Sequence, residues 1–392
     1  TRVPEEARAE MRVLVRHPGS IGLLLAAAAL ATACDDADPN VHPHLELIGG
    51  SSVRAKAAPP KDGPLVAFRR DVEGISLVAT IGSLQEPTTA FGQITDLVVD
   101  SAGRIYVLDA ENHEIREFAP DGTFRRRFGG RGDGPMEFRN PVALAFTPAG
   151  MLAVASGRSI KFFDVADSTI KPIGTWPLVE IPGARDMCVL GHDLVIRGNN
   201  PDTAHHIVHL VGEDGVRRRS FARGYEHGSF IVRGEMSRGP IACVEEPPLI
   251  IVGYYNLPVV EAFDTAGNLR WRAYIPDFTP ERFIESVTDE GKLSVSYDNS
   301  RPSNKLLSLV SAPGGVVIAE VTSLGPAEPG TTVSYFRRVR AFAFSAEDGS
   351  MLQLPDLPAR VKAVTSTHLY AADAHPTELY PRLRIFRRPP AN

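Results

Sequence analysis

The sequence predicts an all-β fold, a six-bladed β-propeller with four-stranded blades, which follows a signal peptide and a flexible tether. A unit of four short strands recurs about every 47 to 60 residues and is clearest at residues 95–138. There the runs LVV, IYVLD, EIREFA and FRRRF are separated by turns at Asp100–Gly103 and Pro120–Gly122. Repeats of this size, made of four strands each, are typical of propellers. Because propellers host unrelated functions, the fold alone does not name an activity.

The innermost and second strands of the repeat can be followed along the whole chain. They recur at 97–109, 142–155, 187–198, 241–255, 306–321 and 361–373. The last unit ends after a third strand at 383–388, whereas the run GISLVATIG at 74–82 precedes the first complete blade. We expect this N-terminal strand to complete the last blade, because closing the ring removes an exposed sheet edge.

The first 34 residues have the features of a bacterial export signal. Met11 is the predicted start, and basic residues follow it. The apolar run at 18–33 is shorter than the ~20 residues that a membrane-spanning helix needs, and it ends in small residues as a cleavage site does. The segment LATAC resembles a lipobox, which predicts lipidation of Cys34. An ordinary secretory signal cleaved nearby is the alternative.

Residues 35–63 are predicted to be a tether and residues 64–392 the propeller. The tether is rich in Asp, Pro, Ala and Gly and lacks hydrophobic periodicity. We therefore expect a propeller in the bacterial cell envelope that is held to a membrane by its lipid anchor, on the periplasmic side in a Gram-negative cell. Asp35 resembles an inner-membrane retention signal, but that rule varies between bacteria, so the choice of membrane stays open.

The composition is that of an ordinary globular protein. The chain has 392 residues, of which 43% are hydrophobic, and a formal net charge of −5. About 330 residues after the tether are ample for one large core. The near-balanced charge gives no reason to expect a nucleic-acid partner.

Two cysteines besides Cys34 fall on innermost strands of successive blades. They are Cys188 and Cys243. Equivalent positions of neighbouring blades are expected to lie further apart than the ~7 Å between Cα atoms that a disulfide tolerates. Both are therefore predicted to be unpaired, small buried hydrophobes.

The link between the first two complete blades carries a family resemblance. Residues 97–146, and above all FGGRGDGPMEFRNPVALAF at 128–146, resemble the NHL-type six-bladed β-propeller superfamily. The other blades match only in pattern. The resemblance implies the propeller fold, and the superfamily includes lipid-anchored bacterial propellers, lactonase-like enzymes and peptide-amidating lyases. It does not select one activity among them.

Polar residues gather in the loops and blade links of one face of the predicted ring. We expect them to form a binding rim around the channel mouth, where loops vary without disturbing the core. The predicted rim residues are Arg185, Asp186, Arg238, Arg360, Asn140, His113, Tyr254 and Tyr255. Arginines and tyrosines in this arrangement favour an anionic or carbohydrate-like ligand, although a solvated face with structural arginines is the alternative.

The resemblance also implies where an enzyme of this superfamily would hold a metal. Calcium-dependent lactonases place Glu, Asn and Asp at the inner ends of separate blades. Asp96, Asn140 and Asp186 occupy comparable positions, but Arg238 and Arg360 hold two others and oppose Ca²⁺ electrostatically. The lyase pattern needs several histidines, and only His113 and His375 are loosely placed for it. Neither set is complete.

The sequence therefore predicts an exported propeller that binds a protein, peptide or glycan of the cell envelope, without a cofactor and without nucleic acid. The alternative is a hydrolase or lyase with Ca²⁺ or Zn²⁺ at the rim. A passive structural subunit of an envelope complex is a third interpretation. Binding is favoured over catalysis, because neither a complete ligand set nor a nucleophile with a nearby base can be recognised in the sequence.

Overall fold

The computed structural model describes residues 61–390, with gaps at 167, 180, 182, 199–204, 288–290, 292, 298–301, 326–335 and 375–378. The signal peptide with Cys34, most of the tether and His375 lie outside the described residues. No helix within the described ranges has the length and apolar character needed to cross a membrane.

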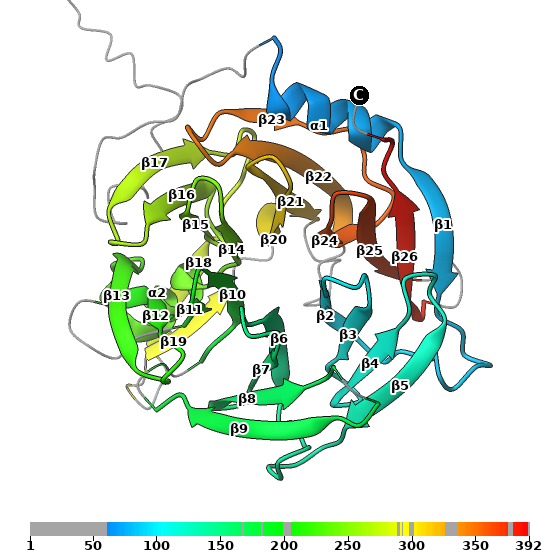
Figure 1. Cartoon of the computed structure of the whole chain (residues 1–392). Helices are drawn as coiled ribbons and strands as arrows, with labels where there is room; N and C mark the ends of the chain where they lie inside the picture. The colour runs from blue at the N-terminus through cyan, green and yellow to red at the C-terminus, as the bar shows by residue number, and fades with distance from the viewer. Residues whose placement is uncertain are drawn as a thin grey trace, which may run out of the picture. The chain divides into compact units, whose positions relative to one another are not determined.

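Six four-stranded antiparallel sheets are found among the described residues, and they are arranged as blades around a central channel (Figure 1). Blade 1 consists of β2 (Ile94–Val99), β3 (Ile105–Asp109), β4 (Glu114–Phe118) and β5 (Phe124–Gly129), and blade 2 of β6 (Pro141–Phe146), β7 (Leu152–Ser156), β8 (Ser159–Asp164) and β9 (Lys171–Pro177). Blade 3 consists of β10 (Asp186–Leu190), β11 (Asp193–Arg197), β12 (His206–Val211) and β13 (Arg217–Arg223), and blade 4 of β14 (Ile241–Val244), β15 (Leu249–Gly253), β16 (Val259–Asp264) and β17 (Leu269–Tyr274). Blade 5 consists of β20 (Ser303–Ala312), β21 (Val316–Leu324), β22 (Phe336–Ser345) and β23 (Met351–Gln353), and blade 6 of β24 (Arg360–Val364), β25 (His368–Ala374), β26 (Pro381–Arg387) and β1 (Ser76–Ile81).

The ring closes as the sequence predicts. Strand β1 pairs antiparallel with β26, with Leu77 opposite Phe386 and Ile81 opposite Leu383. The first of the described strands thus supplies the outer strand of the last blade, and the outer edge of β26 is covered. Figure 1 shows β1 in blue beside β26 in red.

Burial explains the strand sequences. All five residues of β3 are buried, as are those of β7 and β15, because the second strand of a blade is enclosed by the two neighbouring blades. The outer strand β5 instead alternates between partly exposed and exposed positions over most of its length. Its arginines are not free, since Arg125 and Arg126 both pair with Glu117 of β4, at 3.1 and 2.5 Å.

A helix that the all-β prediction missed precedes β1. Helix α1 (Pro64–Glu73) begins with Pro at its first position, where no backbone donor is needed, and buries Leu65, Phe68 and Val72. These side chains join the core cluster that contains residues of β21, β22 and β24. Arg388 pairs with Asp71 at 2.7 Å and fixes the end of the chain to α1.

Two further elements interrupt the repeat near blades 3 to 5. Helix α2 (Phe230–Ser237) lies in the link between β13 and β14, and the side chain of Ser229 caps it by accepting from the Val232 N–H. A two-stranded sheet, β18 (Phe283–Val287) and β19 (Leu293–Tyr297), lies in the link between β17 and β20. The hydroxyl of Tyr297 donates to Glu235 at 2.7 Å, so the hairpin and α2 are in contact.

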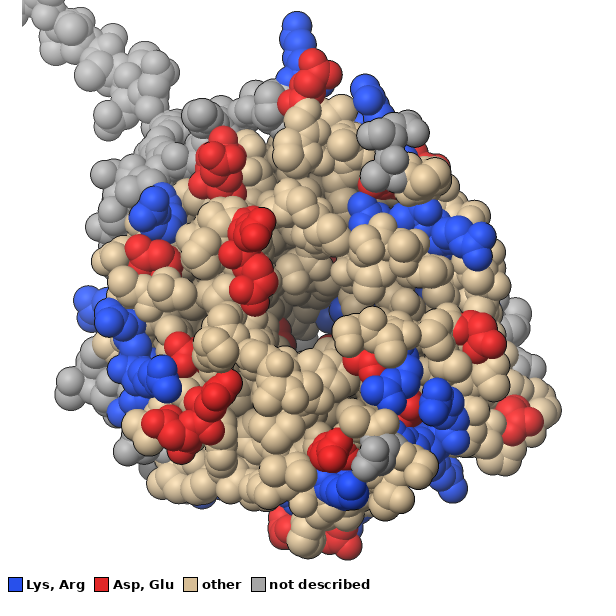
Figure 2. Space-filling view, in the orientation of Figure 1, with Lys and Arg blue, Asp and Glu red and all other residues tan. Residues whose placement is uncertain are grey.

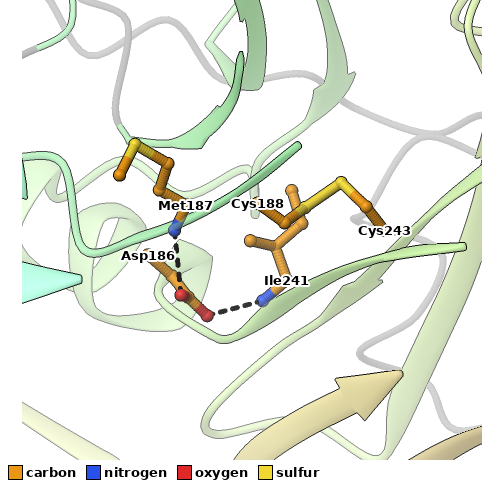
Figure 3. Close-up of a disulfide and its surroundings, with 5 residues drawn as sticks. All are labelled: Asp186, Met187, Cys188, Ile241 and Cys243. Carbon is orange, nitrogen blue, oxygen red and sulfur yellow. Dashed lines mark hydrogen bonds between the residues drawn. A yellow bond between two sulfur atoms is a disulfide. The ribbon is translucent and has the colours of Figure 1, made fainter. Parts of the chain in front are cut away.

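The prediction that Cys188 and Cys243 are unpaired is wrong. They form a disulfide with Cα atoms 5.7 Å apart, which joins β10 of blade 3 to β14 of blade 4 (Figure 3). The expected separation did not account for the convergence of innermost strands at the channel. The same two strands are also joined by a hydrogen bond from the Ile241 N–H to Asp186, at 2.9 Å.

Candidate functional site

The innermost strands line the central channel. The channel cavity has a volume of about 310 Å³ and is lined by residues of β2, β6, β10, β14, β20 and β24, including Asp96, Asp186 and Lys362. Figure 2 shows the ring hollowed at its centre, with charged atoms visible inside the hollow.

Acidic residues at the start of two innermost strands fasten neighbouring blades. Asp96 accepts from the N–H of Leu97 in its own strand, at 2.8 Å, and from that of Leu144 in blade 2, at 2.7 Å. Asp186 repeats the arrangement with Met187 at 2.9 Å and, as described above, with Ile241 of blade 4. Both oxygens of each carboxylate therefore complete the backbone hydrogen bonding of adjacent blades.

A bulge recurs near the start of four innermost strands. One residue is added relative to the second strand at Thr95, Val142, Leu307 and Lys362. Bulges re-aim the backbone and side chains around them. Two bulge carbonyls accept from cations of blade 6: the carbonyl of Leu307 from Arg360 at 2.7 Å, and that of Thr95 from Lys362 at 2.5 Å.

The charges inside the channel shift one another. Burial raises the pKa of Asp186 to about 7, and the carboxylate of Asp96 contributes to the rise. Burial also raises the pKa of Asp96 and of Glu320. The pKa of Lys362 is lowered to about 8 by burial and by the nearby Arg360. Asp96, Asp186 and Lys362 of three innermost strands therefore interact electrostatically, whereas Glu320 lies in the second strand β21.

An open pocket of about 350 Å³ lies at the channel mouth, between blades 3, 4 and 5. Its lining consists of Arg185, Asp186, Arg238, Gly239, Pro240, Tyr255 and Leu307. Four of the predicted rim residues therefore meet in one pocket, and Arg360 reaches it through the Leu307 carbonyl. We refer to this pocket with Arg360 as the mouth pocket.

The mouth pocket is rich in guanidinium groups. Arg185 is exposed. Arg238 pairs with Glu235 at 2.6 Å, and its guanidinium carbon lies 5.4 Å from the centre of the Tyr255 ring. The Nε atoms of Arg238 and Arg360 are buried and have no hydrogen-bond partner among the described residues. Burial raises the pKa of Tyr255, against the opposing effect of these two arginines.

Tyr254 is not a rim residue, and that prediction is wrong. Its side chain is completely buried, and its hydroxyl donates to Glu261 at 2.7 Å. The Arg197 guanidinium carbon lies 5.2 Å from its ring centre. Tyr255, in the turn that follows β15, lines the mouth pocket instead.

His113 and Asn140 do not line the mouth pocket. His113 lies in the turn between β3 and β4 with φ 54°, and its Nδ1 is buried without a hydrogen-bond partner among the described residues. Asn140 is exposed immediately before β6, with φ 51°. Both adopt the left-handed conformation that turns require, which gives each a local backbone role.

Sequence reasoning missed a buried ion pair beside the mouth pocket. Lys305 of β20 pairs with Glu281 and donates to Asn256 at 2.5 Å, and its ammonium lies 5.3 Å from the Tyr255 ring centre. Lys362 was also missed, although it lies two residues after Arg360 in an innermost strand. For Glu281, in the irregular link after β17, the sequence carries no such signal.

Among the described residues, no group of three or more His, Cys, Asp or Glu side chains is placed to hold a metal ion. Asp96 and Asp186 face the channel but already accept four backbone hydrogen bonds between them. The arrangement fits the recognition of an anionic group by arginines better than it fits cation binding.

Comparisons with known proteins agree with this geometry at the level of the fold. The NHL repeat family matches residues 91–118, which form the start of blade 1. No curated protein matches this chain.

Three solved structures illustrate the likeness. A Bacteroides fragilis protein described as exported has a TM-score of 0.51 at 9% identity, over 86% of this chain and 99% of that one. A DUF4221 member from Bacteroides vulgatus has a TM-score of 0.49 at 10% identity, over 81% and 99%. Virginiamycin B lyase of Staphylococcus aureus has a TM-score of 0.42 at 10% identity, over 78% and 82%. At these identities a likeness concerns the fold alone, and we base no argument on the two lower scores. Together with the ring of blades, these findings show a β-propeller fold whose first blade carries a match to the NHL repeat.

Proposed function

We propose that this propeller is an exported, lipid-anchored binding protein that captures an anionic group of an envelope protein, peptide or glycan in the mouth pocket. The observation that carries the proposal is that Arg185 and Arg238 line one pocket, with Arg360 hydrogen-bonded to Leu307 of its lining. A carboxylate or sulfate that entered the pocket would accept charge-assisted hydrogen bonds from the guanidinium groups.

The arrangement of the pocket supports binding rather than turnover. Arg238 is held by Glu235 and by the ring of Tyr255, and Arg360 is held by the Leu307 carbonyl. Side chains fixed in this way lose little freedom when a ligand binds, which favours affinity. The one carboxylate in the lining, Asp186, is engaged by two backbone N–H groups.

The test uses the detergent-solubilised full chain and two defined acidic probes, polyglutamate and polygalacturonate, with neutral dextran as the uncharged reference. We expect at least one acidic probe to bind in a salt-dependent manner. The double variant Arg185→Ala with Arg238→Ala should weaken that binding by about tenfold or more, since hydrogen bonds to charged groups contribute about 1.5–3 kcal/mol. Arg70→Ala, on the exposed side of α1, is the matched control. Equal binding by the double variant and the wild type would contradict the proposal.

The anchor is tested separately. Radiolabelled palmitate should be incorporated into the full chain in a bacterial host, and Cys34→Ser should abolish the label. A labelled Cys34→Ser chain would exclude this anchor, whereas an unlabelled wild-type chain found in the membrane-free fraction would favour a secreted protein.

A further inference from the structure

A second pocket lies beside the mouth pocket, between α2 and the chain that leads into β18 and β20. Its volume is about 420 Å³. Its lining consists of Tyr225, His227, Val232, Met236, Thr279, Pro280, Glu281, Arg282, Phe283, Pro302 and Ser303. We refer to it as the α2 pocket. It is built by the two elements that interrupt the blade repeat, so the propeller framework does not require it.

One side of the α2 pocket is apolar and aromatic. The rings of Tyr225 and His227 are stacked, with centres 6.3 Å apart and planes 21° apart. Val232 and Met236 of α2 are buried in the core and line the pocket. Phe283 packs against Tyr297 with ring centres 5.1 Å apart. An apolar side chain that entered here would meet rings and a thioether rather than water.

The elements that build the pocket also expose large apolar side chains. Phe230 is 72% exposed, Val287 70% and Ile284 47%. Ile231 and Tyr297 are exposed by 37% and 42%. Helix α2 and the hairpin thus leave large apolar side chains in solvent next to the pocket that they build, and such exposure is typical of protein-interaction surfaces.

The α2 pocket and the mouth pocket share a rigid boundary. Glu235 of α2 accepts from Tyr297 at 2.7 Å and pairs with Arg238, which lines the mouth pocket. Glu281 lines the α2 pocket and pairs with Lys305, whose ammonium lies near the Tyr255 ring of the mouth pocket. An apolar pocket therefore lies next to a cationic one, and the boundary between them is hydrogen-bonded.

We infer that the two pockets together dock one polypeptide segment, which inserts an aromatic or aliphatic side chain into the α2 pocket and places acidic residues at the mouth arginines. The inference rests on the proposed function and narrows its ligand from a protein, peptide or glycan to a polypeptide. The apolar part of the α2 pocket, formed by Val232, Met236 and Phe283, decides this, because it matches an apolar side chain and offers no polar groups to a sugar. The arginines supply charge complementarity to the acidic residues.

The test is an array of synthetic decapeptides probed with the full chain. The peptides combine one anchor residue, Phe, Leu or Ser, with zero, one or three aspartates at two to five residues from the anchor. We expect the strongest binding for Phe or Leu combined with three aspartates, and a loss of about tenfold when the anchor is Ser. The variant Phe283→Ser changes a partly buried residue that lines the α2 pocket and should remove the anchor dependence, while polyglutamate binding stays unchanged. Val78→Ser, an exposed apolar residue of β1, is the control.

The outcomes separate this inference from the proposed function. If the Ser anchor binds as well as Phe, or if Phe283→Ser leaves the anchor preference intact, the α2 pocket plays no part and the inference is wrong. If polygalacturonate binds at the arginines and no array peptide exceeds its scrambled form, the inference is also wrong but the proposed function stands. If the double variant Arg185→Ala with Arg238→Ala binds every probe as well as the wild type does, the proposed function fails as well.

Discussion

The carboxylate of Asp186 accepts a hydrogen bond from the backbone N–H of Ile241 at 2.9 Å, so a side chain of blade 3 completes the backbone hydrogen bonding of blade 4 (Figure 3). Its other oxygen accepts from Met187. The same residue lines both the channel and the mouth pocket. A residue predicted as part of a binding rim thus also fastens two blades.

Replacing Asp186 by Asn should destabilise the protein by about 1–3 kcal/mol, the cost of leaving a buried donor without its acceptor. An amide offers one oxygen, and its NH₂ group would face one of the two backbone N–H donors. Urea unfolding measures the loss, with Asp62→Asn, at an exposed position before α1, as the control. An unchanged urea midpoint for Asp186→Asn would show that the two hydrogen bonds of Asp186 contribute nothing to stability.

The stability of the wild-type chain should fall as pH rises from about 4 to about 7, relative to that of Asp186→Asn. The pKa of Asp186 is raised from 3.8 to about 7 in the folded protein. The folded state therefore binds more protons than the unfolded state in this window, and the stabilisation present below about pH 4 is lost as pH rises through 7. Melting temperatures at four pH values test this. If the difference in melting temperature between the two proteins did not change with pH, the titrating group would be a residue other than Asp186.

Removing the disulfide with Cys188→Ser and Cys243→Ser should cost about 4 kcal/mol, as expected for a bridge between residues 55 positions apart. The bridge restricts the unfolded chain between blades 3 and 4. Calorimetry with and without a reducing agent measures the effect, and the double variant should be insensitive to the reducing agent. Alkylation of both thiols in the unreduced wild-type chain would contradict the bridge itself.

Replacing Glu281 by Gln should destabilise the chain by about 3–5 kcal/mol, because the ammonium of Lys305 would remain buried without its counter-charge. Burial already lowers the pKa of Lys305, and Glu281 opposes that shift. Combining Glu281→Gln with Lys305→Met should recover most of the loss, since neither charge is then buried. Urea unfolding of the two variants gives the comparison, and equal losses in both would show that the pair is not coupled.

Calcium should not bind in the channel. Four backbone N–H groups occupy the oxygens of Asp96 and Asp186, and the nearby Lys362 and Arg360 repel a cation. Melting temperatures in calcium, zinc and chelator should agree within about 1 °C, because an ion that binds only the folded state would raise them. A stoichiometric ion with a clear rise would instead support the hydrolase or lyase with a rim metal.

The blades were predictable because their pattern is local. Buried runs such as IYVLD and the Asp-Gly turns repeat at a nearly constant spacing, and the missing last strand required closure by β1. The clustering of Arg185, Arg238 and Tyr255 followed from the same repeat, since each lies in a blade link or strand end on one face.

The contacts between blades were not predictable in this way. Whether Cys188 reaches Cys243, and whether Tyr254 or Tyr255 faces the mouth, depends on how strands from distant parts of the chain converge at the channel. Helix α2 and the hairpin β18–β19 break the repeat, so its period gave no sign of the pocket between them.

By itself the sequence determined that this chain forms a propeller, how many four-stranded blades its repeat supports and which face carries the polar loops, because strand period and turn chemistry act over a few residues. Only the tertiary structure decided which of those polar groups are buried or already hydrogen-bonded within the protein. One oxygen of Asp186 accepts from Met187 of its own strand and the other from Ile241 of the neighbouring blade. Tyr254 is buried, and the Nε atoms of Arg238 and Arg360 have no partner among the described residues. The hydrogen bond between Asp186 and Ile241 joins residues that lie 55 positions apart in the sequence, and only the closed ring brings them within hydrogen-bonding distance.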